Sequence, residues 1–193
     1  MCKISVRTVK AAALTAILIT SILAAGCSSI PGNSWRTKLA ADLPVLGHRN
    51  WIVVADSAYP AQSRPGIETI ATNADHLEVT KSVLETVDKA PHVRPTVYLD
   101  VEMKYVAEES APGIDAYRKT LYSLLDKHPV KSIPHEQLIA KLDEAAKTFT
   151  ILILKTDFTI PYTSVFIELD CGYWSTESER KLRRAMQETI QDR

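Results

Sequence analysis

Apolar and polar positions along the chain predict an alternation of strands and helices. Three short apolar runs are typical of strands buried on both faces of a sheet: Trp51–Ala55, Phe149–Leu154 and Ser164–Leu169. A weaker strand is expected at Ile67–Ala71. A further strand is expected over Thr96–Val106, where apolar residues alternate with other residues and β-formers are common.

Apolar residues at helical spacing predict helices around these strands. Two of the helices open at prolines, Pro112 and Pro134, and the first turn of a helix accommodates proline well. A capping-box pattern opens a charged last helix at Thr176. The other two helices are expected at Ser34–Leu43 and at about Asp75–Lys89. This alternation predicts an α/β fold, a single domain with helices flanking a substantially buried sheet.

The N-terminus has the features of an export signal. Three basic residues, Lys3, Arg7 and Lys10, precede the apolar run Ala11–Ala25, which has the length of a signal-peptide core and is short for a transmembrane helix. The run ends in LAAGC, which resembles a lipobox, so we expect cleavage before Cys27 and lipidation of that cysteine. An ordinary signal peptide and an uncleaved anchor are the alternatives.

This interpretation divides the chain into four parts. Residues 1–26 are the expected lipoprotein signal peptide, and residues 27–34 a tether rich in serine and helix-breaking residues. Residues 35–174 form the expected domain, and residues 175–193 a C-terminal helix. A lipidated, exported chain belongs to the cell envelope, and we expect it at the outer membrane or cell surface rather than in the cytoplasm.

Charge and cysteine content narrow the classes of partner. Lys and Arg number 23, as do Asp and Glu, and no clustered basic segment favours nucleic acid as a partner. Cys2 would leave with the signal and Cys27 would carry lipid, so Cys171 alone remains and no intramolecular disulfide is expected. The chain contains neither CxxC nor HExxH, so no zinc motif is visible and no metal site is expected.

Candidate chemistry lies near the strand ends, where open α/β sheets bind ligands. Asp56 follows the first apolar strand, His48 precedes it, and His135 lies in the first turn of a helix, where the dipole disfavours the imidazolium. Each residue has a simpler interpretation as a turn cap, a surface-loop residue or a solvated helix-start residue. We expect the other histidines at the surface: His76, His92 and His128.

Three motifs form a set: GHRNWIVVADSAYPA at 47–61, PHEQ at 134–137, and IPYTS at 160–164 with the apolar strand and glycine that follow. Together they resemble the RbsD/FucU family of ribose pyranases and fucose mutarotases. The histidine-to-aspartate spacing of the first motif is that of the family, and the resemblance covers roughly residues 35–173. It implies an RbsD/FucU-like domain. The exported signal and the last helix are additions to the familiar family pattern.

The resemblance implies roles for individual residues. His48 matches the proton-donating histidine of the family, and Asp56 matches its sugar-binding carboxylate. His135 and Tyr162 match further sugar contacts, and Ser164 stands where the family has asparagine. One more expected substrate contact is Lys131, four residues before His135, although a lysine there is most often solvent-facing.

The implied reaction is the opening and reclosure of a sugar ring. It needs a proton delivered to the ring oxygen and one removed from the anomeric hydroxyl, for which histidine is well suited. No cofactor, metal or covalent intermediate is required. We therefore expect an isomerase acting on a fucose- or ribose-like monosaccharide. The resemblance also implies a ring-shaped homo-oligomer with pockets completed at subunit contacts. A non-catalytic sugar-binding lipoprotein and a purely structural one are the alternatives.

Overall fold

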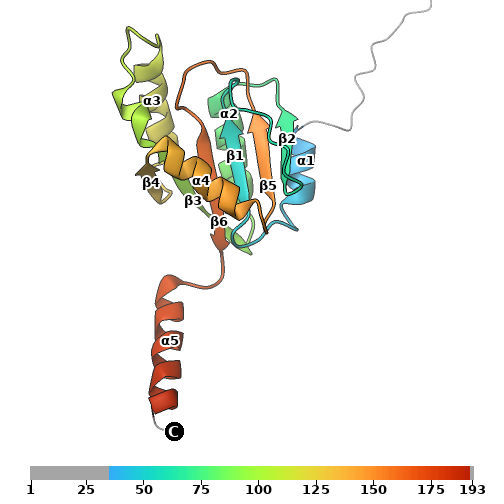
Figure 1. Cartoon of the computed structure of the whole chain (residues 1–193), viewed down its shortest axis with the longest axis vertical. Helices are drawn as coiled ribbons and strands as arrows, with labels where there is room; N and C mark the ends of the chain where they lie inside the picture. The colour runs from blue at the N-terminus through green and yellow to red at the C-terminus, as the bar shows by residue number, and fades with distance from the viewer. Residues whose placement is uncertain (1–34, 192–193) are drawn as a thin grey trace, which may run out of the picture. The chain divides into compact units, whose positions relative to one another are not determined.

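The computed structural model describes residues 35–191, and side chains through residue 188. Figure 1 shows a sheet with helices on both faces. Along the chain the elements are α1 (Trp35–Asp42), β1 (Trp51–Ala55), β2 (Ile67–Ala71), α2 (His76–Asp88), β3 (Val93–Asp100), the 3-10 helix η1 (Val101–Tyr105), α3 (Ile114–Leu124), β4 (Val130–Ile133), α4 (His135–Ala145), β5 (Ile151–Lys155), β6 (Val165–Cys171) and α5 (Thr176–Gln191). The predicted α/β class is confirmed.

The sheet is mixed, with strand order β2-β5-β1-β6-β3-β4. β6 runs antiparallel to its neighbours β1 and β3, whereas the other pairings are parallel. Five strands therefore end at one edge of the sheet, and β6 begins there. This topology brings the residues after β1, at the end of β3, after β4 and before β6 to a common edge.

Two apolar layers cover the faces of the sheet. Ile52 and Val54 of β1 pack in the core beneath α1, α2 and α3, while Trp51, Val53 and Ala55 pack in a second core beneath α4. All five residues of β1 are buried. Side chains alternate between the faces of a strand, so a central strand covered on both faces is apolar throughout.

Two regions of the sheet differ from the prediction. The strand expected over Thr96–Val106 ends at Asp100, and Val101–Tyr105 forms a 3-10 helix although its apolar alternation continues. Strand β4 was not predicted, because its four residues VKSI lie at the sheet edge with none of them buried. The remaining strands and helices begin and end within a few residues of their expected positions.

The two ends of the chain differ in what the structure describes. The expected signal peptide, tether and lipidated Cys27 lie outside the described residues. No helix within residues 35–191 is both long enough and apolar enough to cross a membrane.

The described side chains of α5 are exposed or half-buried. Gly172, which precedes α5, leaves no room for a side chain, because an added Cβ would lie 2.7 Å from the carbonyl oxygen of Pro91.

Candidate functional site

A cavity of about 380 Å³ opens at the edge where five strands end. Its lining includes Asp56 and Tyr59 after β1, His135 and Ile139 of α4, and Tyr162 from the loop before β6. Residues more than 70 positions apart in the chain thus meet in one hollow. A carboxylate, an imidazole and two phenol rings face it, and this combination suits a small polyhydroxyl ligand with both apolar and hydroxyl surface.

Asp56 is held in place by two donors. The backbone N–H of Ala58 donates to Oδ1 over 2.9 Å, and the hydroxyl of Ser164 donates to Oδ2 over 2.8 Å. The backbone N–H of Asp56 in turn donates to the Ser164 oxygen over 3.2 Å. Ser164 is 2% exposed and is not among the residues lining the cavity. Ser164 therefore supports Asp56, and its direct contact with a ligand stays a prediction.

His135 is fixed through both its backbone and its ring. Its N–H, the first of α4, donates to both carboxylate oxygens of Glu102 over 3.0 Å. Its Nδ1 lies 3.2 Å from Oδ2 of Asp100, an ion-pair distance without the direction of a hydrogen bond. The side chain is 33% exposed, so one side of the ring faces the cavity while the other contacts a buried carboxyl.

Asp100 is the buried partner that the sequence did not reveal. It is 1% exposed, and neither carboxylate oxygen accepts a hydrogen bond from the residues that the structure describes. Burial raises the pKa of its carboxyl to about 6; the nearby His135 opposes this rise, and the charges of Glu102 and Asp56 add to it. Asp100 ends an apolar strand as Asp56 does, but the prediction extended that strand past it.

Tyr162 lines the cavity from an unusual backbone conformation. Its φ is +59°, in the left-handed region that costs a residue with a Cβ roughly 1 kcal/mol or more. The ring is edge-on to His135, with the ring centres 5.6 Å apart. The residue is 41% exposed. The chain thus accepts local strain at a position that presents an aromatic ring to the cavity.

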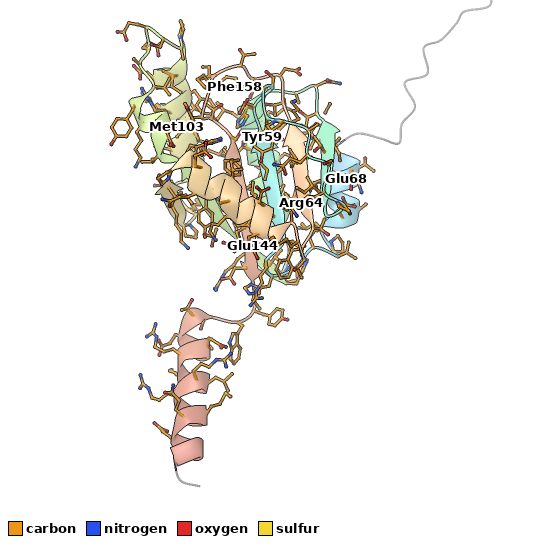
Figure 2. All side chains as sticks on the ribbon, viewed as in Figure 1. Tyr59, Arg64, Glu68, Met103, Glu144 and Phe158 are labelled. Carbon is orange, nitrogen blue, oxygen red and sulfur yellow. The ribbon has the colours of Figure 1, made fainter. Side chains whose placement is uncertain are left out.

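His48 lies at the opposite end of β1 from Asp56. Its Nδ1 is 3.1 Å from Oδ1 of Asp170, and its side chain is 55% exposed. His48 and Glu144 line a separate cavity of about 340 Å³. Figure 2 shows the separation, with Tyr59 of the first cavity toward one end of the sheet and Glu144 toward the other. The structure does not bring His48 and Asp56 together within one chain.

Lys131 also lies apart from the Asp56 cavity. It belongs to β4, where it is paired in register with Tyr98 of β3. Its Nζ donates to the Tyr98 hydroxyl over 3.3 Å, and Lys131 is not among the residues that line the cavity. A ligand contact by Lys131 therefore stays a prediction.

The expectation of a surface position is wrong for His76, which is 1% exposed. The Tyr117 hydroxyl lies 3.1 Å from His76 Nδ1 and donates to the Thr163 carbonyl over 2.9 Å. Burial lowers the pKa of His76 to about 4, against the opposing effects of the Val54 carbonyl and nearby acidic charges. His92 is also half-buried, with Nε2 near two carbonyl oxygens, and the side chain of His128 is 10% exposed.

Within the described residues 35–191, no cluster of three or more His, Cys, Asp or Glu side chains is arranged to hold a metal ion. Asp56 accepts hydrogen bonds, the His135 imidazole can donate or accept them, and Tyr59 and Tyr162 offer aromatic surface.

Comparisons with known proteins give one family match and several structural matches. The model of the RbsD / FucU transport protein family matches residues 35–171. RbsD from Bacillus subtilis, complexed with D-ribose, is 21% identical, with a TM-score of 0.49; the match covers 68% of this chain and 90% of that one. The fucose mutarotase from Streptococcus pneumoniae, in complex with L-fucose, is 18% identical, with 68% and 89% covered and a TM-score of 0.47. No curated protein matches the chain.

Proposed function

Because the chain belongs to the RbsD/FucU family, we propose that it binds a monosaccharide in the Asp56 cavity and interconverts its anomers or ring forms. The observation that carries the proposal is the group of Asp56, His135 and Tyr162 around one hollow at the strand ends. No cofactor is needed for this chemistry. The proposed substrate is an aldose of the fucose or ribose type.

The side chains of the cavity match the chemistry of a sugar. The two oxygens of Asp56 each accept one internal hydrogen bond, and a carboxylate oxygen has further lone pairs for sugar hydroxyls. Tyr162 and Tyr59 offer aromatic surface for the C–H face of a sugar ring. The volume of about 380 Å³ falls in the range of about 300–1,000 Å³ that is usual for small-molecule sites.

The proton shuttle, His48, would come from a second copy of the chain. A strand advances about 3.3 Å per residue, so Trp51 and Asp56 at the two ends of β1 are about 16 Å apart. His48 lies beyond Trp51, too far for its ring to reach a sugar held by Asp56 of the same chain. A homo-oligomer in which the His48 end of one copy meets the Asp56 cavity of another removes this difficulty.

The reaction requires only proton transfers and one reversible C–O bond. An imidazolium at His48 would protonate the ring oxygen while the anomeric hydroxyl loses its proton to a base. The bond between the anomeric carbon and the ring oxygen then breaks, and a carbonyl forms. Reclosure from the other face or through another hydroxyl returns the protons. General acid–base catalysis of this kind supplies about 10²–10⁴-fold, or roughly 3–5 kcal/mol of barrier.

A non-catalytic monosaccharide-binding protein is the second candidate. The observation that favours it is Ser164, which stands where the family has asparagine. In this structure its hydroxyl is already bonded to Asp56 and buried. One ligand contact of the family pattern is thereby shortened or lost, while the acceptor at Asp56 is kept.

Exchange NMR on monosaccharides distinguishes the two candidates. Saturation transfer between anomer or ring-form signals should be faster with the protein than without it for at least one aldose. His48→Ala should abolish most of this acceleration and leave binding within a few-fold, whereas Asp56→Asn should weaken binding. His128→Ala, at a histidine next to Asp88 away from either cavity, is the matched control. If the wild type binds a monosaccharide but does not accelerate its exchange, the function is sugar binding without catalysis.

We propose that the protein acts at the cell envelope, anchored to a membrane by a lipid attached to Cys27. The support is the small-residue run before that cysteine and the basic, apolar segment ahead of it. Cys27→Ser should abolish metabolic labelling with a fatty acid and release the chain from the membrane fraction. Unchanged labelling of the variant would contradict the lipid anchor.

A further inference from the structure

The His48 end of the sheet contains a group of three interacting side chains. Asp170, on β6, directly faces Arg94 of β3 in the antiparallel register. Arg94 donates to Asp170 Oδ2 twice, from Nε over 3.0 Å and from Nη2 over 2.6 Å. The second oxygen, Oδ1, accepts the Cys171 backbone N–H over 2.8 Å and lies 3.1 Å from His48 Nδ1. Both oxygens of this carboxylate therefore have partners within the chain.

These contacts fix the charge of Asp170 as well as its position. Partial burial raises the pKa of its carboxyl. The hydrogen bonds from Arg94 and the Cys171 backbone, together with the charges of Arg94 and His48, lower it by more. The pKa of Asp170 therefore lies below its ordinary value. Asp170 is thus ionised at neutral pH. A carboxylate beside one ring nitrogen of a histidine holds the proton on that nitrogen.

The free side of the His48 ring faces open space. The side chain is 55% exposed and borders two cavities, of about 340 and 440 Å³. The other charged groups that line these cavities come from four elements and the loop before β1: Arg49, Lys141, Glu144, Glu168, Arg94, Glu179 and Arg183. None of them is paired with His48 in the described part of the chain, where Asp170 is its recorded ion-pair partner.

We propose that Asp170, clamped by Arg94, is the positioning residue for His48. It holds the neutral imidazole as the Nδ1–H tautomer and directs Nε2 outward as the nitrogen that exchanges protons with a sugar. The inference rests on the proposed function for what Nε2 does, but the tautomer is a property of the folded chain alone. In many catalytic and metal-binding sites a carboxylate likewise accepts a histidine N–H and fixes the tautomer and orientation of the ring.

The test is the tautomer of His48, read from the ¹⁵N shifts of its ring in the full-length chain with labelled histidine. His48→Gln assigns the signals. At a pH where the ring is neutral, the wild type should show Nδ1–H, whereas an unpaired imidazole in water prefers Nε2–H. Asp170→Asn should lose this preference, because an amide can accept from or donate to Nδ1, and Asp170→Glu should retain it. Asp88→Asn, at the separate pair with His128, is the matched control.

Activity gives a second readout. Asp170→Asn should lower the exchange rate at saturating sugar by about 10–100-fold, the usual loss for an orienting partner, with half-saturation within a few-fold. If His48 of the wild type is the Nε2–H tautomer, the inference is overturned, and this result does not depend on whether Asp170→Asn folds. The inference is also overturned if Asp170→Asn folds and His48 keeps the same tautomer. If the tautomer depends on Asp170 but the wild type accelerates no sugar, the positioning contact stands and the proposed function fails.

Discussion

Two buried titratable side chains near Asp56 have pKa values displaced in opposite directions. Burial lowers the pKa of His76 to about 4 and raises the pKa of Asp100 to about 6. In both cases folding favours the neutral form. Their contributions to the pH dependence of stability therefore oppose each other between about pH 4 and 6, and single substitutions separate them.

Replacing His76 should make the protein less sensitive to acid. The unfolded histidine takes up a proton near pH 6.5, whereas the folded one does so only near pH 4, so the contribution of His76 to stability falls as the pH falls between these values. This contribution is on the order of 3 kcal/mol. His76→Gln should remove it from the pH dependence of the free energy of unfolding, measured in urea between pH 7 and 4. An unchanged slope would contradict the buried neutral imidazole.

Replacing Asp100 should have the opposite effect. Its raised pKa contributes stability that is fully present below about pH 3.8 and is lost as the pH rises through about 6. At pH 7 the buried carboxylate costs on the order of 3 kcal/mol. Asp100→Asn should therefore raise the free energy of unfolding at pH 7 and leave it nearly unchanged at pH 4. Equal effects at both pH values would rule out the carboxyl titration as the cause.

At the scale of elements, burial decided what could be predicted. Strands β1, β5 and β6 are central, and their continuous apolar runs were recognised for that reason. The edge strand β4 has no buried residue and gave no such run. In η1 the apolar residues still alternate as in a strand, although the backbone forms a 3-10 helix. A prediction based on alternation alone therefore made β3 too long. Local patterns report burial better than they report where a chain changes direction.

The last helix, α5, adds little to the stability of the domain. Its described side chains are exposed or half-buried, and its recorded ion pairs join residues of the same helix. Exposed pairs of this kind stabilise by less than about 1 kcal/mol. A chain ending at Trp174 should therefore keep its free energy of unfolding within about 1 kcal/mol and lose helical signal in circular dichroism. A larger loss in denaturant unfolding would show that α5 packs on the domain.

At the scale of the whole molecule, the sequence indicated candidate site residues one by one but not their arrangement. Asp56, His135 and Tyr162 were expected together, and the strand directions bring them to one cavity. His48 was expected beside them, yet it precedes the strand that Asp56 follows. The contacts of Asp100, Glu102 and Asp170 were not predicted, because they join residues 33 to 122 positions apart in the chain.

Complementation between two inactive variants tests the central claim most directly. His48→Ala keeps Asp56, and Asp56→Asn keeps His48, so a mixed oligomer contains some sites with both wild-type groups. Random assembly of equal amounts gives about a quarter of such sites when each site draws its two groups from different copies. Co-expressed variants should therefore recover about a quarter of the wild-type rate of sugar exchange. A rate no higher than the sum of the two separate variants would contradict a site shared between copies.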